Sequence, residues 1–331
     1  SFMGVRMQTD YSTGKSTFVE TGQGIYSECE INQGVTVIVI DEGSYLTETF
    51  LQIMFRRLDP DKFKVLIVGD PYQLIDHEDG DTAAAFNHGW EESTLSEMMR
   101  TNDADLEELV MSARQGVIDN ELPTININGA SIVHMDRPTF EKEMLSNFTQ
   151  GDDNFLAYQN DRVTFYNTVL HKHFTGKDFF VKGDIAISNY YVGNKVRTIR
   201  NNEKVKIGNI QKVENKICIP SSPYRFTGHE VSIGGTKFLM PANRKHRKQI
   251  FAELKEKGDY NGLKAMYGLM IELRHSYAST IHKAQGSTRN IIYLDLDDIN
   301  EARRFNELCR LLYVGIGRAK TKLVLVGDIT K

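Results

Sequence analysis

Two neighbouring carboxylates follow a short apolar segment of the chain. The segment Val35–Ile40 reads Val-Thr-Val-Ile-Val-Ile and leads directly into Asp41 and Glu42. Such a run predicts a strand buried on both faces of a parallel sheet, and ligands bind at the carboxyl ends of strands of this kind. Asp41 could hold Mg²⁺ there, directly or through water, and Glu42 could orient or deprotonate the water that attacks a phosphate. The alternative is a buried strand with an acidic turn.

A second segment of the same type strengthens the first interpretation. Residues 63–69 form another apolar run and end at Asp70, and residues 46–58 between the two runs have a helical pattern. This order predicts two parallel strands joined by a right-handed helical connection, so that both acidic ends lie at one edge of the sheet. Gln73 lies just beyond the second end, and its amide both donates and accepts hydrogen bonds. It is suited to sensing a terminal phosphate or its attacking water.

The N-terminal segment contains a misleading motif. Thr13-Gly-Lys-Ser-Thr17 copies the end of a phosphate-binding loop, but such a loop needs a glycine five positions before Gly14, where Thr9 stands. The segment also lacks a buried apolar strand before it. We therefore reject a phosphate loop here, and predict that residues 5–11 and 16–21 pair as a hairpin.

The C-terminal fifth of the chain contains two further polar clusters. Residues 277–288 combine hydroxyls, His282, a lysine, a glutamine and a glycine before an apolar strand, a set that suits phosphates or a nucleic-acid backbone. His282 could equally be a hydrogen-bonded histidine near a helix start. Arg318 lies in a glycine-flanked turn between a predicted helix (301–313) and a predicted strand (323–327), where a planar guanidinium could clamp a phosphate.

The middle of the chain predicts alternating helices and strands. Residues 93–116 have a helical period with Gly116 as a stop, and Arg100 is either a surface arginine or a phosphate contact. Turn formers at 119–130 mark the best domain boundary. Beyond it the pattern predicts further α/β elements, listed as helices 139–148 and 161–174 and a strand at 154–158.

Residues 182–233 have a different pattern. Short alternating strands separated by turn residues predict a small antiparallel barrel or meander inserted into the second α/β domain. The expected strands are 184–188, 195–199, 204–207, 217–219 and 230–233. A basic cluster at 244–248 leads into a predicted helix at 249–257, either as a solvated helix start or as a contact to a nucleic-acid backbone.

Composition sets only loose limits. The 331 residues are enough for two or three domains, and the net charge of −4 argues against indiscriminate coating of nucleic acid without excluding a basic channel. No apolar run approaches the length of a membrane span. Cys29, Cys218 and Cys309 have no metal-binding spacing, so we expect free thiols in a reducing, cytoplasmic compartment.

Five of these stretches occur in the order of the motifs of superfamily 1 helicases. They are Asp41–Ser44, Gly69–Leu74, Arg100, Ser279–Gly286 and Tyr313–Arg318. Within that superfamily the chain most resembles the RecD-like branch, and specifically the Dda helicases of phages. The resemblance covers almost the whole chain and implies a monomeric, ATP- and Mg²⁺-dependent motor that moves 5′→3′ on single-stranded DNA and acts at a DNA fork.

The resemblance also implies roles for individual residues at the nucleotide. Asp41 would help to hold Mg²⁺ and Glu42 would activate water. Gln73 would sense the γ-phosphate, and Arg100 and Arg318 would be the two arginines that face the phosphates.

Further residues would line the ATP cleft or contact DNA. Asp70 and Gly286 would belong to the cleft, and Thr280, His282 and Lys283 would contact single-stranded DNA. Thr280, His282 and Gly286 would couple the cleft to that strand.

The resemblance divides the chain into domains. Residues 1–118 would be the remainder of a first RecA-like domain, and residues 119–183 and 275–331 a second one, with a Src-homology-like β-barrel at 184–274. A hairpin at about 4–30 would carry the strand-separating pin. By the resemblance, Phe18 falls where the pin's aromatic residue would lie. A phenylalanine at a hairpin tip is also physically suited to act as a wedge, since it can stack on the last base pair; ordinary packing is the alternative for Phe18.

The chain departs from the family in two places. The phosphate-binding loop, with its Gly-Lys-Thr lysine, should precede residue 1 and is absent from the sequence, and Gly317 stands where relatives usually place Thr or Ser. Without that loop, affinity for a triphosphate should largely collapse. We therefore expect an N-terminally truncated helicase that is inactive as an ATPase in this form. The alternatives are a non-hydrolysing module that binds single strands, and an RNA-directed viral helicase.

Overall fold

The computed structural model describes eight stretches of the chain, which form two compact units. The described residues are 5–9, 16–20, 36–75, 82–95, 97–194, 196–217, 225–241 and 244–330. The first unit comprises Gly22–Tyr166 and Tyr277–Lys331, together with the first four residues, and the second comprises Val5–Thr21 and Asn167–Ser276. Among the described residues, no helix is both long enough and apolar enough to cross a membrane.

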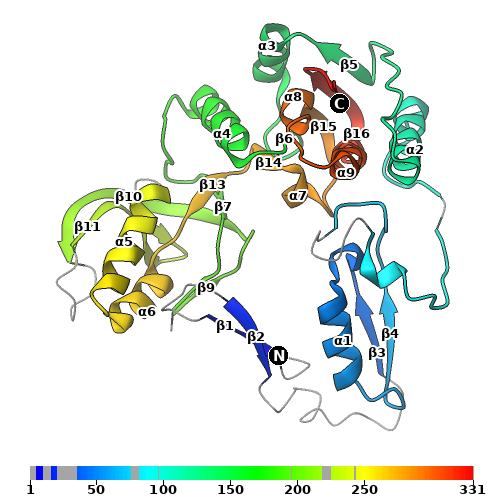
Figure 1. Ribbon diagram of the computed structural model, residues 1–331. Coiled ribbons are helices and arrows are strands. Elements are labelled where there is room, and N and C mark those ends of the chain that lie inside the picture. The colour runs from blue at the N-terminus through cyan, green and yellow to red at the C-terminus, as the bar shows by residue number, and fades with distance from the viewer. Residues whose placement is uncertain are drawn as a thin grey trace. The chain divides into compact units, whose positions relative to one another are not determined.

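The predicted strand–helix–strand unit is present in the first unit (Figure 1). Strand β3 (Thr36–Ile40) and strand β4 (Phe63–Ile67) pair in parallel, with Thr36 opposite Phe63. Helix α1 (Glu48–Arg57) connects them and begins at Thr47, whose side chain accepts a hydrogen bond from the Phe50 amide. This cap accounts for the helix start. Two short 3₁₀ helices, Gly43–Tyr45 and Ala84–Phe86, flank the strand ends.

The expectation that these strands are buried on both faces is wrong. The side chains that pack toward α1 are Ile38, Ile40, Val65 and Ile67. The alternate positions are exposed by 59% at Val37, 61% at Val39, 52% at Leu66 and 43% at Val68. Successive side chains point to opposite faces of a strand, and among the described residues α1 covers only one face of this two-stranded sheet.

A second parallel sheet completes the first unit, and its strand order is β14-β6-β15-β16-β5. In chain order its strands are β5 (Ile132–Met135), β6 (Asn154–Ala157), β14 (Ala278–Thr280), β15 (Arg289–Asp295) and β16 (Ala319–Val326). All four pairings are parallel, as expected for an α/β domain. The sheet joins segments on both sides of the second unit, so the antiparallel part is an insertion, as predicted.

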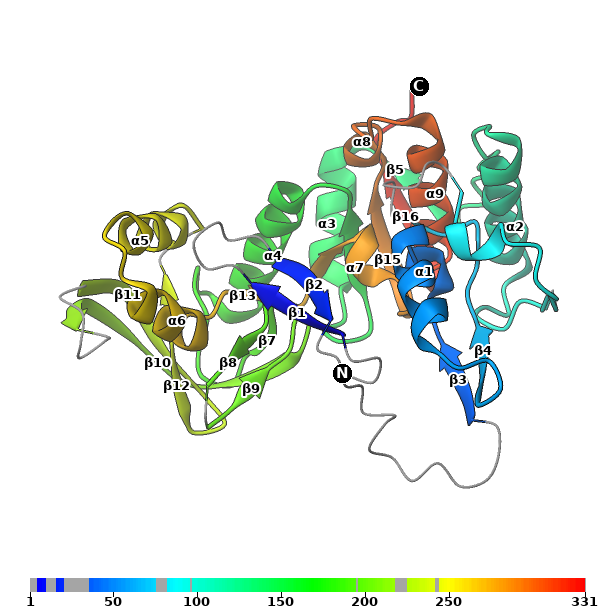
Figure 2. The same cartoon turned by 60° about the horizontal axis from the view of Figure 1, so that its bottom comes forward.

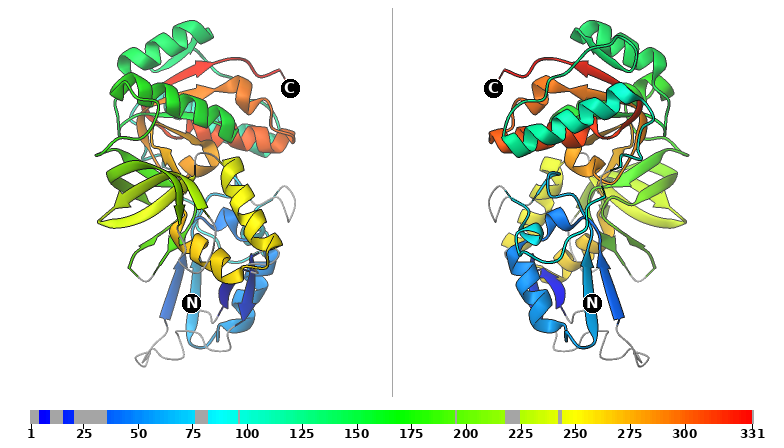
Figure 3. Two further views of the ribbon diagram at one scale, coloured as in Figure 1. Left: turned by 90° about the vertical axis from the view of Figure 1, so that its left-hand side faces the viewer. Right: turned by 90° about the vertical axis from the view of Figure 1, so that its right-hand side faces the viewer.

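Helices surround this sheet. They are α2 (Ala104–Asp119), α3 (Arg137–Asn147), α4 (Asn160–Thr175), α7 (Ile281–Ala284), α8 (Leu296–Ile299) and α9 (Phe305–Ile316). Figure 3 shows α2 lying beside α9, and their buried residues share one core with β15 and β16.

Helix α2 begins later than the pattern predicted and does not end at Gly116. Residues 97–103 are irregular, and the helix starts after Asp103, whose carboxylate accepts a hydrogen bond from the Leu106 amide. It passes through Gly116 and ends at Asn120, which has a φ of 57°. The position of the Asp103 cap, and not the apolar periodicity, determines where the helix starts. Asn120, and not Gly116, provides the left-handed residue that ends the helix.

The second unit contains the inserted antiparallel sheet, in the order β12-β11-β10-β7-β13 (Figure 2). Its elements are β7 (Ile185–Ser188), β8 (Val192–Gly193), β9 (Thr198–Ile199), β10 (Lys204–Ile217), β11 (Arg225–Ile233), β12 (Thr236–Pro241), α5 (Arg244–Glu256), α6 (Tyr260–Leu269) and β13 (Leu273–His275). Residues 204–217 form one long strand, with irregular register after Ile207 and Val213, and not two short ones. Strand β12 was not predicted, and the basic cluster forms the first turn of α5.

The N-terminal hairpin is confirmed. Strands β1 (Val5–Thr9) and β2 (Ser16–Glu20) pair antiparallel, with Thr9 opposite Ser16. Phe18 pairs with Met7 in the middle of β2, so it does not stand at the tip as we had expected. The rejected phosphate-loop motif lies mostly in residues 10–15, which are outside the described residues, as are Cys29 and Cys218.

Candidate active site

The predicted Mg²⁺ ligand Asp41 and the predicted base Glu42 follow β3 in a strained turn. Glu42 has φ 56° and ψ 45°, the left-handed region that non-glycine residues rarely adopt. Its amide donates to Asp41 Oδ1 at 2.9 Å, and the next amide, of Gly43, donates to Val68 O at 2.9 Å. The left-handed conformation costs about 1–2 kcal/mol, and backbone strain of this kind is concentrated at functional sites.

Two glycines let the β3 and β4 loops meet backbone to backbone. A Cβ on Gly69 would lie 2.7 Å from Gly43 N, and a Cβ on Gly43 would lie 2.4 Å from Ile67 Cγ2. Neither position has room for a side chain. The close approach places Asp41 and Glu42 next to the loop that carries Asp70, as the parallel-strand argument predicted.

The loop after β4 is bonded to helix α9. The Tyr313 hydroxyl donates to Asp70 Oδ2 at 2.6 Å, and Gln73 Nε2 lies 3.4 Å from the same oxygen. Burial, followed by the nearby Asp70 charge, raises the pKa of Tyr313, so its hydroxyl remains a donor at neutral pH.

Arg310 makes the strongest contacts to this loop. Its Nη1 donates to Pro71 O at 2.7 Å and to Gln73 O at 2.5 Å, and its Nε donates to Asn306 Oδ1 at 2.7 Å. The side chain is only 3% exposed. A buried guanidinium that satisfies two main-chain carbonyls fixes the path of the loop, and with it the position of Gln73.

Arg318 is buried and forms no ion pair with a carboxylate of the described residues. It is 1% exposed and donates from Nε to Val314 O at 3.0 Å, from Nη1 to Ser287 O at 3.4 Å and from Nη2 to Gln73 Oε1 at 3.4 Å. All three acceptors are neutral. Burial lowers the pKa of Arg318 to about 10 and the neighbouring Arg100 contributes to the decrease, while the charges of Glu42 and Asp70 act in the opposite direction.

Arg100 is the second cation at this place. It is exposed, and its Nη1 donates to Gly317 O at 3.4 Å. Within the part of the chain that the structure describes, Arg318 has no carboxylate in ion-pair range. Two arginines with neutral partners form a site that an anion would stabilise, because a buried charge is costly until it is paired.

The Glu42 side chain is contacted by the segment after α7. Gln285 Nε2 donates to Glu42 Oε2 at 3.1 Å, and the Tyr45 hydroxyl donates to Gln285 Oε1 at 2.6 Å. Gly286 has a φ of +75°, and a Cβ on it would lie 3.2 Å from Glu42 Oε1. Burial, followed by the Glu42 charge, raises the pKa of Tyr45 to about 12.

Three of the four residues predicted to contact DNA lie on and around α7, and the fourth, Phe18, lies in β2. Thr280 is buried and caps this helix, with its hydroxyl accepting from the Lys283 amide at 3.4 Å. His282 and Lys283 are exposed, and the His282 ring lies 6.1 Å from the Tyr158 ring. The structure thus gives Thr280 a capping role and leaves His282 and Lys283 accessible.

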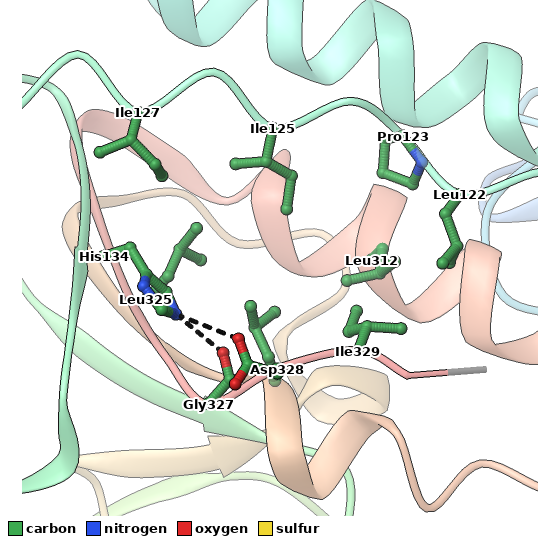
Figure 4. Close-up of a pocket in the computed structure, with 11 residues that line it drawn as sticks. Leu122, Pro123, Ile125, Ile127, His134, Leu312, Leu325, Gly327, Asp328 and Ile329 are labelled. Carbon is green, nitrogen blue, oxygen red and sulfur yellow. Dashed lines mark hydrogen bonds and ion pairs between the residues drawn. The ribbon is translucent and has the colours of Figure 1, made fainter.

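A separate cavity of about 290 Å³ lies at the end of β16 (Figure 4). Its walls are mostly apolar side chains, including Ile125, Leu312 and Ile329. Its polar contacts join His134 Nε2 to Gly327 O at 2.8 Å and to Asp328 Oδ1 at 3.9 Å. None of the residues predicted for catalysis or DNA contact lines it.

The structure brings together most of the predicted catalytic residues, and it adds four that the sequence reasoning missed. The additional residues are Tyr45, Gln285, Arg310 and Tyr313. Gln285 and Tyr313 lie within the motif stretches, Tyr45 directly follows one, and Arg310 lies just before one. The spacing of three between Arg310 and Tyr313 places both on one face of α9, which was a usable signal.

Two protein-family models match parts of the chain. Residues 5–134 match a AAA domain, and residues 275–326 match the UvrD-like helicase C-terminal domain. These matches support a superfamily 1 helicase that uses a nucleotide.

Individual similar proteins are distant. The uncharacterized protein R530 of Acanthamoeba polyphaga mimivirus is 18% identical, over 94% of this chain and 78% of its own length. The crystal structure of a Bacteroides Pif1 helicase with ADP-AlF3 and single-stranded DNA is similar with a TM-score of 0.47 and 14% identity, over 89% of this chain and 71% of that one. The crystal structure of the Candida albicans Pif1 helicase is similar with a TM-score of 0.47 and 15% identity, over 88% of this chain and 72% of that one.

Proposed function

We propose that this chain is part of an ATP-driven helicase that translocates on single-stranded DNA. The observation that carries the proposal is the buried Arg318, which forms no ion pair with a described residue, with Arg100 beside it and Gln73 bonded to it. A terminal phosphate would give Arg318 a direct ion-pair partner. Arginine is suited to the task, because its planar fork matches phosphate oxygens.

The carboxylates supply the other half of the chemistry. Glu42 accepts a proton from the attacking water, and the Gln73 amide orients that water or the γ-phosphate. Arg318 and Arg100 stabilise the charge that develops on the transferred phosphoryl group. Mg²⁺ would be held at Asp41, whose carboxylate is exposed beside Glu42, and would neutralise phosphate charge.

Nucleic acid binds along the exposed side of α7 in this proposal. His282 and Lys283 face solvent there, and a protonated amine beside an imidazole is suited to a phosphate backbone. Thr280 acts indirectly, by capping the helix that presents them.

The finer assignments rest on the resemblance to the RecD-like branch. They comprise 5′→3′ movement, action at a fork as a monomer, the domain boundaries given above, and a strand-separating role for the β1–β2 hairpin with Phe18.

The test is ATP hydrolysis by the longest protein that the gene produces, with and without single-stranded DNA. We expect DNA to stimulate ATP hydrolysis by the wild type. Glu42→Gln should lower the turnover about 10²–10⁴-fold and still bind nucleotide, because only the general base is lost. Glu256→Gln, an exposed site on α5, is the matched control and should leave both unchanged. Equal loss of binding and turnover in Glu42→Gln would refute its role as the base.

The DNA preference needs its own test. Single-stranded DNA and RNA of equal length should be competed for binding to the same protein. DNA should bind better. A clear preference for RNA would replace the DNA assignment by an RNA-directed helicase.

A further inference from the structure

An amide bridge joins Glu42 to the segment that follows α7. Gln285 Nε2 donates to Glu42 Oε2 at 3.1 Å, while its Oε1 accepts from the Tyr45 hydroxyl at 2.6 Å. Tyr45 belongs to the 3₁₀ turn that starts directly after Glu42. The Gln285 amide group is thus hydrogen-bonded at both ends: its oxygen accepts from Tyr45 and its nitrogen donates to Glu42.

The direction of these two hydrogen bonds is determined by chemistry. A carboxylate only accepts, so the NH₂ end of the Gln285 amide must face Glu42. The carbonyl end then faces Tyr45, which must donate. The reverse orientation would place an amide oxygen against a carboxylate.

Gln285 is also the residue next to the surface predicted to bind nucleic acid. It directly follows α7 (Ile281–Ala284), which exposes His282 and Lys283. Gly286 approaches the other Glu42 oxygen so closely that a Cβ would lie 3.2 Å from it. Any displacement of α7 along its axis therefore moves the groups that contact Glu42.

We propose that Gln285, held by Tyr45, is a positioning residue that restrains Glu42 until a nucleic-acid strand binds at α7. The hydrogen bond from Gln285 occupies Glu42 Oε2, a carboxylate oxygen that would otherwise be available to receive the proton from the attacking water. A strand that engages His282 and Lys283 shifts residue 285 and frees that oxygen. This inference rests on the proposed function and specifies how the same site is regulated.

The first test compares basal and DNA-stimulated hydrolysis in the longest gene product. The methionine side chain is about as long as that of glutamine but cannot form either hydrogen bond. Gln285→Met should therefore raise the basal kcat about tenfold, as expected for release of one hydrogen bond to a charged group. The stimulated kcat and the KM for ATP should stay unchanged, so the stimulation factor falls by the same ratio. Tyr45→Phe removes only the hydroxyl and should change kcat in the same direction.

The matched control is Gln115→Met on α2. Gln115 is exposed, and its amide also donates to a carboxylate, that of Asp119 at 2.8 Å. It should leave both rates unchanged. A basal rate that is unchanged or lower in Gln285→Met, with full stimulation retained, would overturn the restraint.

A second measurement does not depend on hydrolysis. Hydrogen exchange should be followed at the amides of Tyr45 and Leu46, which donate within the turn after Glu42, each at 3.1 Å. A single-stranded oligonucleotide should accelerate their exchange in the wild type, whereas in Gln285→Met exchange should be fast already and insensitive to the oligonucleotide. If bound oligonucleotide leaves the wild-type exchange unchanged, the inference fails even when hydrolysis is observed. If exchange responds and no hydrolysis occurs, the proposed function fails and the restraint stands.

Discussion

Replacing Arg318 by methionine should stabilise the protein and abolish its turnover. Burial lowers the pKa of Arg318 from 12.5 to about 10. At about 1.4 kcal/mol per pKa unit, the buried charge costs about 3 kcal/mol of folding free energy. Because the folded pKa of this base is depressed, the cost is fully present at every pH below about 10 and is relieved only as the pH rises further.

The methionine also removes favourable contacts. Three hydrogen bonds are lost, but two of them are long, at 3.4 Å, so we assign them about 1 kcal/mol together. The net expectation is a gain of about 2 kcal/mol, or about 5 °C in the unfolding midpoint for a unit of this size. Turnover should fall about 10³-fold or more, as for loss of an arginine finger.

The same substitution at Arg137 provides a control of opposite sign. Arg137 Nη1 and Nη2 donate to the two oxygens of Asp295, at 2.7 and 2.9 Å, and the Asp295 side chain is fully buried. Arg137→Met removes both of these hydrogen bonds from the Asp295 carboxylate, which keeps an ion pair with Arg162 Nε at 3.4 Å and a hydrogen bond from the Asp298 amide at 3.3 Å. Removing one partner of a buried pair costs about 3–5 kcal/mol, and we expect about 2–3 kcal/mol because Arg162 remains and Arg137 is partly exposed.

The assay is thermal and urea unfolding of the three proteins, followed by circular dichroism at pH 7. Arg318→Met should unfold above the wild type and Arg137→Met below it. An Arg318→Met midpoint several degrees below the wild type would refute the reasoning, because it would mean that the arginine is compensated in the folded protein.

Two further predictions concern the backbone contact and the buried thiol. Gly69→Ala should destabilise the first unit by about 1–3 kcal/mol and weaken nucleotide binding, because the alanine Cβ would lie 2.7 Å from Gly43 N. If the unfolding midpoint and the nucleotide affinity are both unchanged, the two loops can separate freely and the reasoning is wrong. Cys309 is buried, and burial raises its pKa to about 11, so iodoacetamide at pH 8 should leave it unmodified in the folded protein, as read by peptide mass spectrometry. Labelling at the rate of a free thiol would contradict the burial of Cys309.

The sequence predicted the elements whose local pattern is strong. The strand–helix–strand unit at 36–67 and the inserted antiparallel sheet follow from continuous or alternating apolar runs, and the hairpin follows from the turn formers around Gly14. The errors have local physical causes. The side-chain cap at Asp103 placed the start of α2, and nothing in the apolar run of β3 showed that one face is open among the described residues.

The candidate site could be predicted only in part. Residues that follow strand ends, such as Asp41, Glu42 and Gln73, can be recognised, because strand order alone brings them to one edge. Gln285 reaches Glu42 across 243 residues of chain, and only the folded structure shows that contact. Likewise, no pattern indicates that Arg318 lacks a charged partner.

Strand displacement tests the central claim most directly. The longest gene product should be mixed with Mg²⁺, ATP and a duplex that carries a single-stranded tail at either the 5′ or the 3′ end. The account predicts ATP-dependent displacement from the 5′-tailed duplex and none in Glu42→Gln. Failure to displace a strand from either substrate, with DNA and nucleotide both bound, would contradict a helicase.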